Sequence, residues 1–134
     1  MSIEKAKATF KRACEEFEAA RDSEDYRQAS EKAWRAAREA VYAVMAAAGF
    51  RKKSTLSPDA IADFEVKFFR RDRSRGKPLA DGYSRAMGTL HGSCFYDGEC
   101  PPFEQLRRAF QRVSDLIGQA EFDVGSISRT RKKR

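Results

Sequence analysis

The sequence has few of the residues that build metal or redox centres. It contains one histidine (His91) and three cysteines, at positions 14, 94 and 100. This spacing matches neither a zinc knuckle nor a redox CxxC motif, and a lone imidazole adds at most one further ligand. We therefore expect Cys14, Cys94 and Cys100 to be reduced thiols packed as small hydrophobic side chains, with no metal and no cofactor.

Long apolar runs are also missing. The longest, residues 40–50, is too short to cross a bilayer, which needs about 20 residues. Charged residues interrupt the first twenty positions, so no signal-peptide core is present, and neither a glycine-rich phosphate loop nor a GxSxG elbow occurs. We expect a cytoplasmic protein without membrane contact. The absence of asparagine, with 17 arginines against 10 lysines, is compatible with a thermophilic or GC-rich source.

The net charge of +7 is concentrated at one end of the chain. Residues 125–134 hold five basic side chains and no acidic one, and the other 22 basic residues nearly balance 20 acidic ones. We predict one helical domain over residues 1–124, followed by a basic disordered tail over residues 125–134. Such a tail can bind phosphates or only aid solubility.

Apolar residues recur every three or four positions, the period of an amphipathic helix, and no segment alternates with period two. Helix starts are indicated at Asp22 or Ser23 and at Ser57, which precedes a proline, and a stop at Gly49. The pattern predicts an all-α fold, an antiparallel, up-and-down bundle of about five helices. The expected helices cover residues 3–20, 25–48, 58–70, 81–95 and 103–122.

The most informative segment is residues 85–98, RAMGTLHGSCFYDG. Five residues separate Arg85 from His91, and the pairs Leu90-His91 and Phe95-Tyr96 follow the same helix. This arrangement resembles the HEPN family (higher eukaryotes and prokaryotes nucleotide-binding), and in particular a poorly characterised archaeal branch of it. The alanine-rich second helix is similar to that branch as well.

The resemblance implies a HEPN-like bundle, commonly a homodimer, in which His91 and Arg85 act on RNA. Active members cleave RNA without metal, using the ribose 2′-hydroxyl as nucleophile, His for proton transfer and Arg for the phosphate. These residue types suit that chemistry. With no second histidine, Tyr96 or Asp97 would assist, and Ala86 replaces the polar residue that usually follows the Arg. The resemblance also implies a small nucleotidyltransferase as partner, in a two-gene or toxin–antitoxin pair.

Helix geometry leaves the role of this motif open. Residues six apart on an ideal helix point about 120° apart and lie about 9 Å apart along the axis. Arg85 and His91 converge in one chain only if the helix deforms, for example at Gly88 or Gly92, or across a dimer. The alternative is a half-buried His91 bonded to a neighbouring helix and a surface Arg85 paired with Asp81.

A second candidate is a basic segment that follows two phenylalanines, Phe68 and Phe69. Basic side chains beside aromatic rings can bind a single nucleic-acid strand through phosphate contacts and stacking. The same residues also fit a solvated charged loop after phenylalanines that belong to the core. The candidate nucleic-acid-binding residues are Arg70, Arg71, Arg73 and Arg75.

Three functions remain open from the sequence. The first is a HEPN-like bundle that binds nucleic acid or a protein partner. The second is a metal-independent endoribonuclease that uses Arg85, His91 and Tyr96. The third is a purely structural protein-interaction module.

Overall fold

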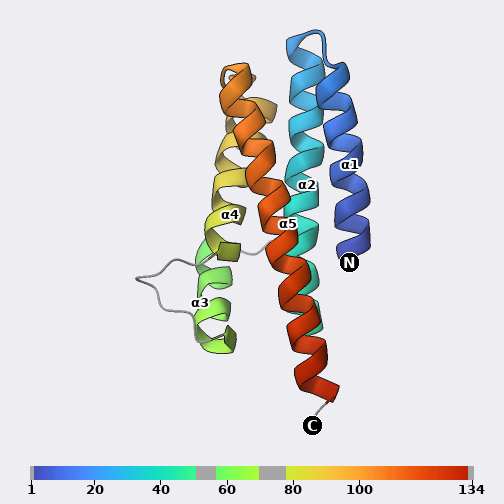
Figure 1. Ribbon diagram of the computed structural model, residues 1–134. Coiled ribbons are helices and arrows are strands. Elements are labelled where there is room, and N and C mark those ends of the chain that lie inside the picture. The colour runs from blue at the N-terminus through green and yellow to red at the C-terminus, as the bar shows by residue number, and fades with distance from the viewer. Residues whose placement is uncertain (1, 51–56, 70–77, 133–134) are drawn as a thin grey trace.

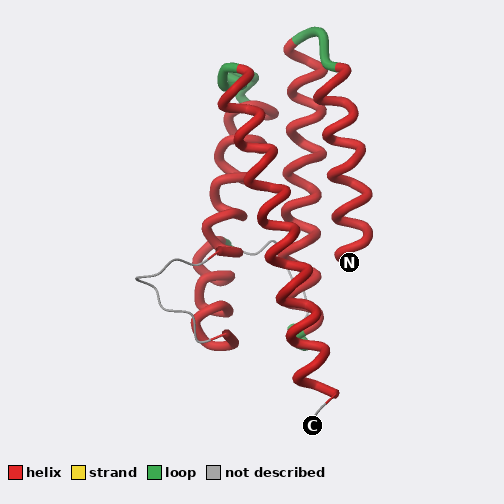
Figure 2. Tube along the Cα trace, viewed as in Figure 1, coloured by secondary structure: helices red, strands yellow, loops and turns green. Residues whose placement is uncertain are grey.

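The computed structural model describes residues 2–50, 57–69 and 78–132, and within these ranges it contains helices and no strand (Figures 1 and 2). Five are α-helices, and one is a π-helix, labelled η2, that continues directly from α4. The helices are α1 (Ile3–Ala19), α2 (Ser23–Ala47), α3 (Pro58–Phe69), α4 (Pro78–Ala86), η2 (Met87–Tyr96) and α5 (Phe103–Lys132).

The helices form the antiparallel, up-and-down bundle that the sequence predicts. Helices α1 and α2 make a hairpin, α4 and η2 form one rod that runs back along the bundle, and α5 returns in the opposite direction (Figure 1). Helix α2 packs against α1, α5, α4 and η2, while the short α3 packs against α4. No helix in the described ranges is both long and apolar enough to span a bilayer.

The local start and stop signals act as the sequence indicates. The Asp22 carboxylate accepts a hydrogen bond from the Asp25 amide at 2.8 Å, and the Ser57 hydroxyl accepts one from the Ala60 amide at 3.1 Å. Each satisfies a backbone donor that the first helical turn leaves unpaired. Gly49 adopts φ 91°, the left-handed conformation that ends a helix most easily at glycine.

Helix α4 begins at Pro78, three residues before the predicted start, and a side chain of α3 caps it. The Ala80 amide donates to Oε1 of Glu65 at 2.7 Å, and Glu65 is fully buried. A carboxylate at a helix N-terminus satisfies a free amide and faces the positive end of the helix dipole. This contact joins α3 to the α4–η2 rod.

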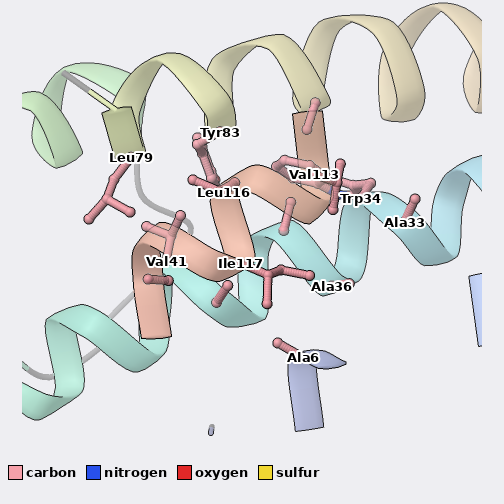
Figure 3. Close-up of a cluster of buried hydrophobic side chains, with 14 of the residues drawn as sticks. Ala6, Ala33, Trp34, Ala36, Val41, Leu79, Tyr83, Val113, Leu116 and Ile117 are labelled. Atoms are coloured by element: carbon pink, nitrogen blue, oxygen red, sulfur yellow. The ribbon is translucent and has the colours of Figure 1, made fainter. Parts of the chain in front are cut away.

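The core is built around small residues of α2. Its alanines let α1, α5 and α4 approach closely, and larger side chains such as Leu79, Val113 and Ile117 from the neighbouring helices fill the space between them (Figure 3). Alanine also has the highest helix propensity, so the same residues favour both the helix and its packing. The buried alanines of α2 are Ala29, Ala33, Ala36, Ala37, Ala40 and Ala43.

Helix α5 is longer than predicted. It runs to Lys132, so the prediction of a disordered tail is wrong for residues 125–132. The apolar stripe continues past the predicted end, through Ala120 and half-buried Val124 to Ile127, which is only 3% exposed. Gly125 and the surrounding basic and hydroxyl residues conceal this stripe in the sequence, but a buried side chain every three or four positions maintains the helix.

The fourth predicted helix changes its winding where glycines occur. From Met87 to Tyr96 it is a π-helix, in which backbone hydrogen bonds join residues five apart, as in the 3.0 Å bond from the Asp97 amide to the Gly92 carbonyl. The segment contains Gly88 and Gly92, the two positions at which deformation was expected. A π-helix has a wider turn than an α-helix and is often found at functional sites. It redirects every side chain after Met87.

The structure contradicts the expectation of three reduced thiols. Cys94, which is buried at the end of η2, forms a disulfide with Cys100 in the connection to α5. Cys14 on α1 is the free cysteine of the described residues. The spacings of a zinc knuckle and of a CxxC motif do not apply to cysteines six positions apart. The turn after η2 nevertheless brings the two sulfurs together. The disulfide ties the end of the π-helix to the start of the next connection.

Replacing a buried alanine of α2 should destabilise the bundle. Ala37 is fully buried, and its substitution Ala37→Leu should lower the free energy of unfolding by about 1–3 kcal/mol, because the three added carbon atoms must displace packed neighbours. The control Ala8→Leu, at an exposed position of α1, should change it by less than about 0.5 kcal/mol. Urea denaturation measures both, and equal effects would contradict the close packing of α2.

The disulfide predicts a thiol count. Non-reduced protein in concentrated guanidinium chloride should show one reactive thiol, Cys14, and three after reduction. In the folded protein Cys14 should react slowly, because burial and, secondarily, the nearby carboxylates of Glu18 and Glu15 raise the pKa of its thiol. The control variant Cys14→Ser should show no reactive thiol before reduction. Three thiols in the non-reduced wild type would disprove the disulfide.

Candidate functional site

His91 points from η2 toward α2 and is bonded there to a carboxylate. Its Nδ1 lies 2.8 Å from Oε2 of Glu31, and the two side chains are 29% and 12% exposed. The other carboxylate oxygen of Glu31 lies 3.7 Å from Nε of Arg35, one turn further along α2. A carboxylate at Nδ1 favours the tautomer with hydrogen on Nδ1, which leaves Nε2 as the proton acceptor. His91 is therefore half-buried and bonded to a neighbouring helix.

Two aromatic rings lie near the imidazole at small interplanar angles. The Trp34 ring stacks on His91 with the centroids 5.3 Å apart, and Phe95 lies parallel to it at 6.3 Å. The guanidinium of Arg38 lies over Trp34 at 6.0 Å, and that of Arg27 over Phe95 at 5.9 Å. Stacking and cation–π contacts thus fix the plane of the imidazole, while Glu31 fixes its rotation.

Arg27 also connects α2 to the last turn of η2. Its Nε and Nη2 donate to the carbonyl oxygen of Phe95 at 2.9 and 2.7 Å, and its Nη1 contacts Glu24 at 3.0 Å. A cation that binds a free carbonyl at a helix C-terminus satisfies that group and complements the helix dipole. One arginine therefore anchors the turn that carries His91.

Tyr96 is brought to His91 by the same turn. Its ring meets the imidazole edge-on, with centroids 4.8 Å apart, and the residue is 67% exposed. It is the last residue of η2 and gives the site an open aromatic surface. Of the three candidate catalytic residues, the structure thus brings His91 and Tyr96 together.

Arg85 lies against another part of the bundle. It lines a groove between α4 and α5, together with Arg112 of α5. No hydrogen bond, ion pair or ring contact joins Arg85 to His91 in the described part of the chain. The deformation of η2 therefore directs His91 to α2, whereas Arg85 stays at α5.

Other candidates contribute less. Arg70, Arg71, Arg73 and Arg75 lie outside the described residues. The ring of Tyr83 contacts that of Trp34. Burial, and secondarily a hydrogen bond with Tyr42, raises the pKa of the Tyr83 phenol, so the phenol stays protonated. Within the described ranges, no group of three metal-binding side chains comes together.

Sequence reasoning missed the contribution of α2 to this site. Arg27, Glu31, Trp34, Arg35 and Arg38 recur at spacings of three and four, so they share one edge of the helix. A tryptophan and a carboxylate interleaved with three arginines form a signal in the sequence. This pattern does not predict which helix packs against that edge of α2. We call the group formed by Glu31, buried Trp34, Arg35, His91 and Tyr96 the α2–η2 face.

Comparison with known proteins shows the family of the chain. No curated protein and no solved structure matches the chain. The model of the archaeal PaREP1/PaREP8 family matches residues 3–117. This range covers the chain from α1 to the middle of α5 and includes all residues of the α2–η2 face. The chain belongs to the archaeal PaREP1/PaREP8 family.

Proposed function

We propose that this protein is a HEPN-like bundle that binds single-stranded RNA on the α2–η2 face. One observation carries the proposal: the imidazole of His91 is bonded to Glu31, contacts the ring of Trp34, and lies beside the exposed Tyr96. The carboxylate at Nδ1 and the ring contacts with Trp34 and Tyr96 together fix the orientation of this histidine.

Each part of this face suits a component of a nucleic-acid strand. The exposed ring of Tyr96 offers a surface on which a base can stack. Arg35, whose side chain is 58% exposed, supplies a guanidinium for the phosphate of the same nucleotide. The net charge of +7 attracts a polyanion at longer range. The combination favours RNA over an uncharged partner.

Binding should depend on Tyr96 and on salt. Fluorescence anisotropy with a labelled single-stranded RNA should show a Kd that rises steeply with salt, and Tyr96→Ala should weaken binding roughly 5- to 150-fold, since one stacked base contributes about 1–3 kcal/mol. The control Phe122→Ala removes another exposed aromatic ring, 64% exposed on α5, and should leave the Kd unchanged.

A second variant separates stacking from charge. Arg35→Gln should reduce the slope of log K against log salt by about 0.7, the value for one phosphate contact on a single strand. Equal losses from Tyr96→Ala and Phe122→Ala, or a slope unaffected by Arg35→Gln, would refute binding at this face. Wild-type protein with no affinity for RNA would leave the protein-interaction module as the function.

The pairing of His91 with Glu31 specifically favours a second function, metal-independent endoribonuclease activity. In such a reaction the 2′-hydroxyl oxygen attacks the adjacent phosphorus, its proton passes to a base, and the 5′-oxygen leaves with a proton from an acid. The product ends are a 2′,3′-cyclic phosphate and a 5′-hydroxyl. An imidazole oriented through Nδ1 by a carboxylate is suited to accept that proton on Nε2. The ring of Tyr96 lies edge-on to this imidazole, with the centroids 4.8 Å apart.

Cleavage in the presence of EDTA should depend on both members of the pair. His91→Ala should lower the rate of cleavage by about 10²–10⁴-fold, the usual contribution of a general acid or base. Glu31→Gln should also lower it, because an amide can present its NH₂ group to Nδ1 and so select the wrong tautomer. The control Glu104→Gln, at an exposed carboxylate of α5, should leave the rate unchanged.

These variants also keep binding and catalysis apart. If wild-type protein cleaves no RNA, or His91→Ala cleaves as fast as wild type, the ribonuclease proposal fails and the binding proposal stands on its own measurement. Circular dichroism at matched concentrations verifies that each variant is folded.

A further inference from the structure

The disulfide between Cys94 and Cys100 closes a loop over residues 94–100 that contains Tyr96. Cys94 is fully buried at the end of η2, whereas Cys100 is half-buried in the connection to α5. A thiolate from solution therefore reaches the sulfur of Cys100 more readily than that of Cys94. When such an attack breaks the disulfide, Cys94 is the leaving group.

The buried sulfur of Cys94 has polar groups of α2 beside it. Its Sγ lies 3.1 Å from Oγ of Ser30 and 3.9 Å from the carbonyl oxygen of Tyr26. Ser30 is itself fully buried, so its hydroxyl faces the sulfur away from water. A hydroxyl can donate a hydrogen bond to a thiolate, and a carbonyl oxygen can accept one from a thiol. The surroundings of Cys94 therefore accommodate its reduced sulfur in either protonation state.

The two halves of the loop are attached differently. The chain up to Phe95 is bound to α2, because Arg27 donates to the Phe95 carbonyl oxygen. Beyond it, the amides of Asp97 and Glu99 bond to carbonyl oxygens within η2 rather than to another helix. Residues 101–102 are prolines, which have no amide hydrogen to donate. The disulfide is therefore the cross-link that fixes the second half of the loop.

We propose that the disulfide is a reversible thiol–disulfide switch that sets the position of Tyr96. One thiolate of a dithiol reductant attacks Sγ of Cys100, and the electron pair of the broken bond passes to Sγ of Cys94, which takes up a proton. The second thiol of the reductant then displaces Cys100 from the mixed disulfide, and Cys100 is protonated in turn. Two electrons and two protons thus pass from the dithiol, which becomes a disulfide. Ser30 donates a hydrogen bond to the departing Cys94 thiolate and makes it a better leaving group.

The consequence for RNA rests on the proposed function of the α2–η2 face. Tyr96 directly follows Phe95, the last residue that Arg27 holds on α2. Reduction therefore releases the exposed ring of Tyr96 while His91 stays bonded to Glu31. Because a binding group fixed beforehand loses less conformational freedom on binding, the oxidised protein is the form that binds RNA more tightly.

Reduction of the folded protein tests the chemistry. Protein incubated with dithiothreitol, quenched in acid and then alkylated in denaturant should change from one thiol to three by mass spectrometry, and oxidised glutathione should reverse the change. Circular dichroism should show that helix content is retained. Ser30→Ala should slow the reduction about three- to tenfold through loss of the hydrogen bond to the thiolate. The control Ser114→Ala, at an exposed position of α5, should not.

Two outcomes of this experiment contradict the proposal. A disulfide that dithiothreitol reduces only in denaturant, or a bundle that unfolds on reduction, would overturn the switch. Equal rates of reduction for Ser30→Ala and Ser114→Ala would overturn the role of Ser30.

Hydrogen exchange and RNA binding test the effect on Tyr96. Reduction should speed amide exchange in residues 96–100 about tenfold or more and leave residues 31–35 of α2 unchanged. The Kd of wild-type protein for single-stranded RNA should rise about fivefold or more on reduction, the lower end of the loss of one stacked base. Cys100→Ser should reproduce the reduced state in both measurements. In the control Tyr96→Ala, reduction should leave the Kd unchanged.

The two readouts separate this proposal from the proposed function. Unchanged exchange in residues 96–100 would overturn the switch whatever RNA does. A wild-type Kd that does not respond to reduction, or responds as that of Tyr96→Ala does, would overturn its effect on Tyr96. If wild-type protein binds no RNA in either state, the proposed function fails, while reduction rates and hydrogen exchange still decide whether the switch exists.

Discussion

The bundle depends on the small-residue surface of α2. Its buried alanines, such as Ala33, Ala36 and Ala40, lie between other helices, and their size lets three helical rods approach one central helix. A larger side chain at any of these positions would separate α2 from a neighbour and expose the apolar stripe on both. This constraint also places polar residues: with so much of α2 covered, its charged side chains are confined to the edges of its contacts.

One of those edges fixes the π-helix. Arg27 binds the carbonyl oxygen of Phe95, Ser30 Oγ lies 3.1 Å from Cys94 Sγ, and Glu31 binds His91. These polar contacts are directional, whereas apolar packing alone would tolerate rotation of the segment. Because Cys94 is also bonded to Cys100, η2 is fixed at its end by a covalent link and along its side by α2. The orientation of the imidazole is a result of both.

Features that depend on neighbours in the sequence could be predicted, and features that depend on distant ones could not. The helix caps at Asp22 and Ser57 follow from local backbone donors, and the bundle from helical periodicity. The end of α5 was missed because Ile127 gains its stability from burial against other helices, which local composition does not reveal. The partner of His91 was missed for the same reason, since Glu31 lies 60 residues away in the chain. The motif contains the one histidine of the sequence but does not reveal its environment.

The fate of Arg85 shows why a linear motif is an incomplete description of a site. Two residues with fixed spacing point in directions set by the turns between them, and here those turns change from α-helical at Ala86 to π-helical at Met87. The chain of contacts that begins at His91 continues through Glu31 to Arg35, so within one chain the guanidinium connected to the imidazole comes from α2. If RNA is cleaved at this face, its phosphate therefore meets Arg35 before it can meet Arg85, unless a second copy of the protein supplies its own.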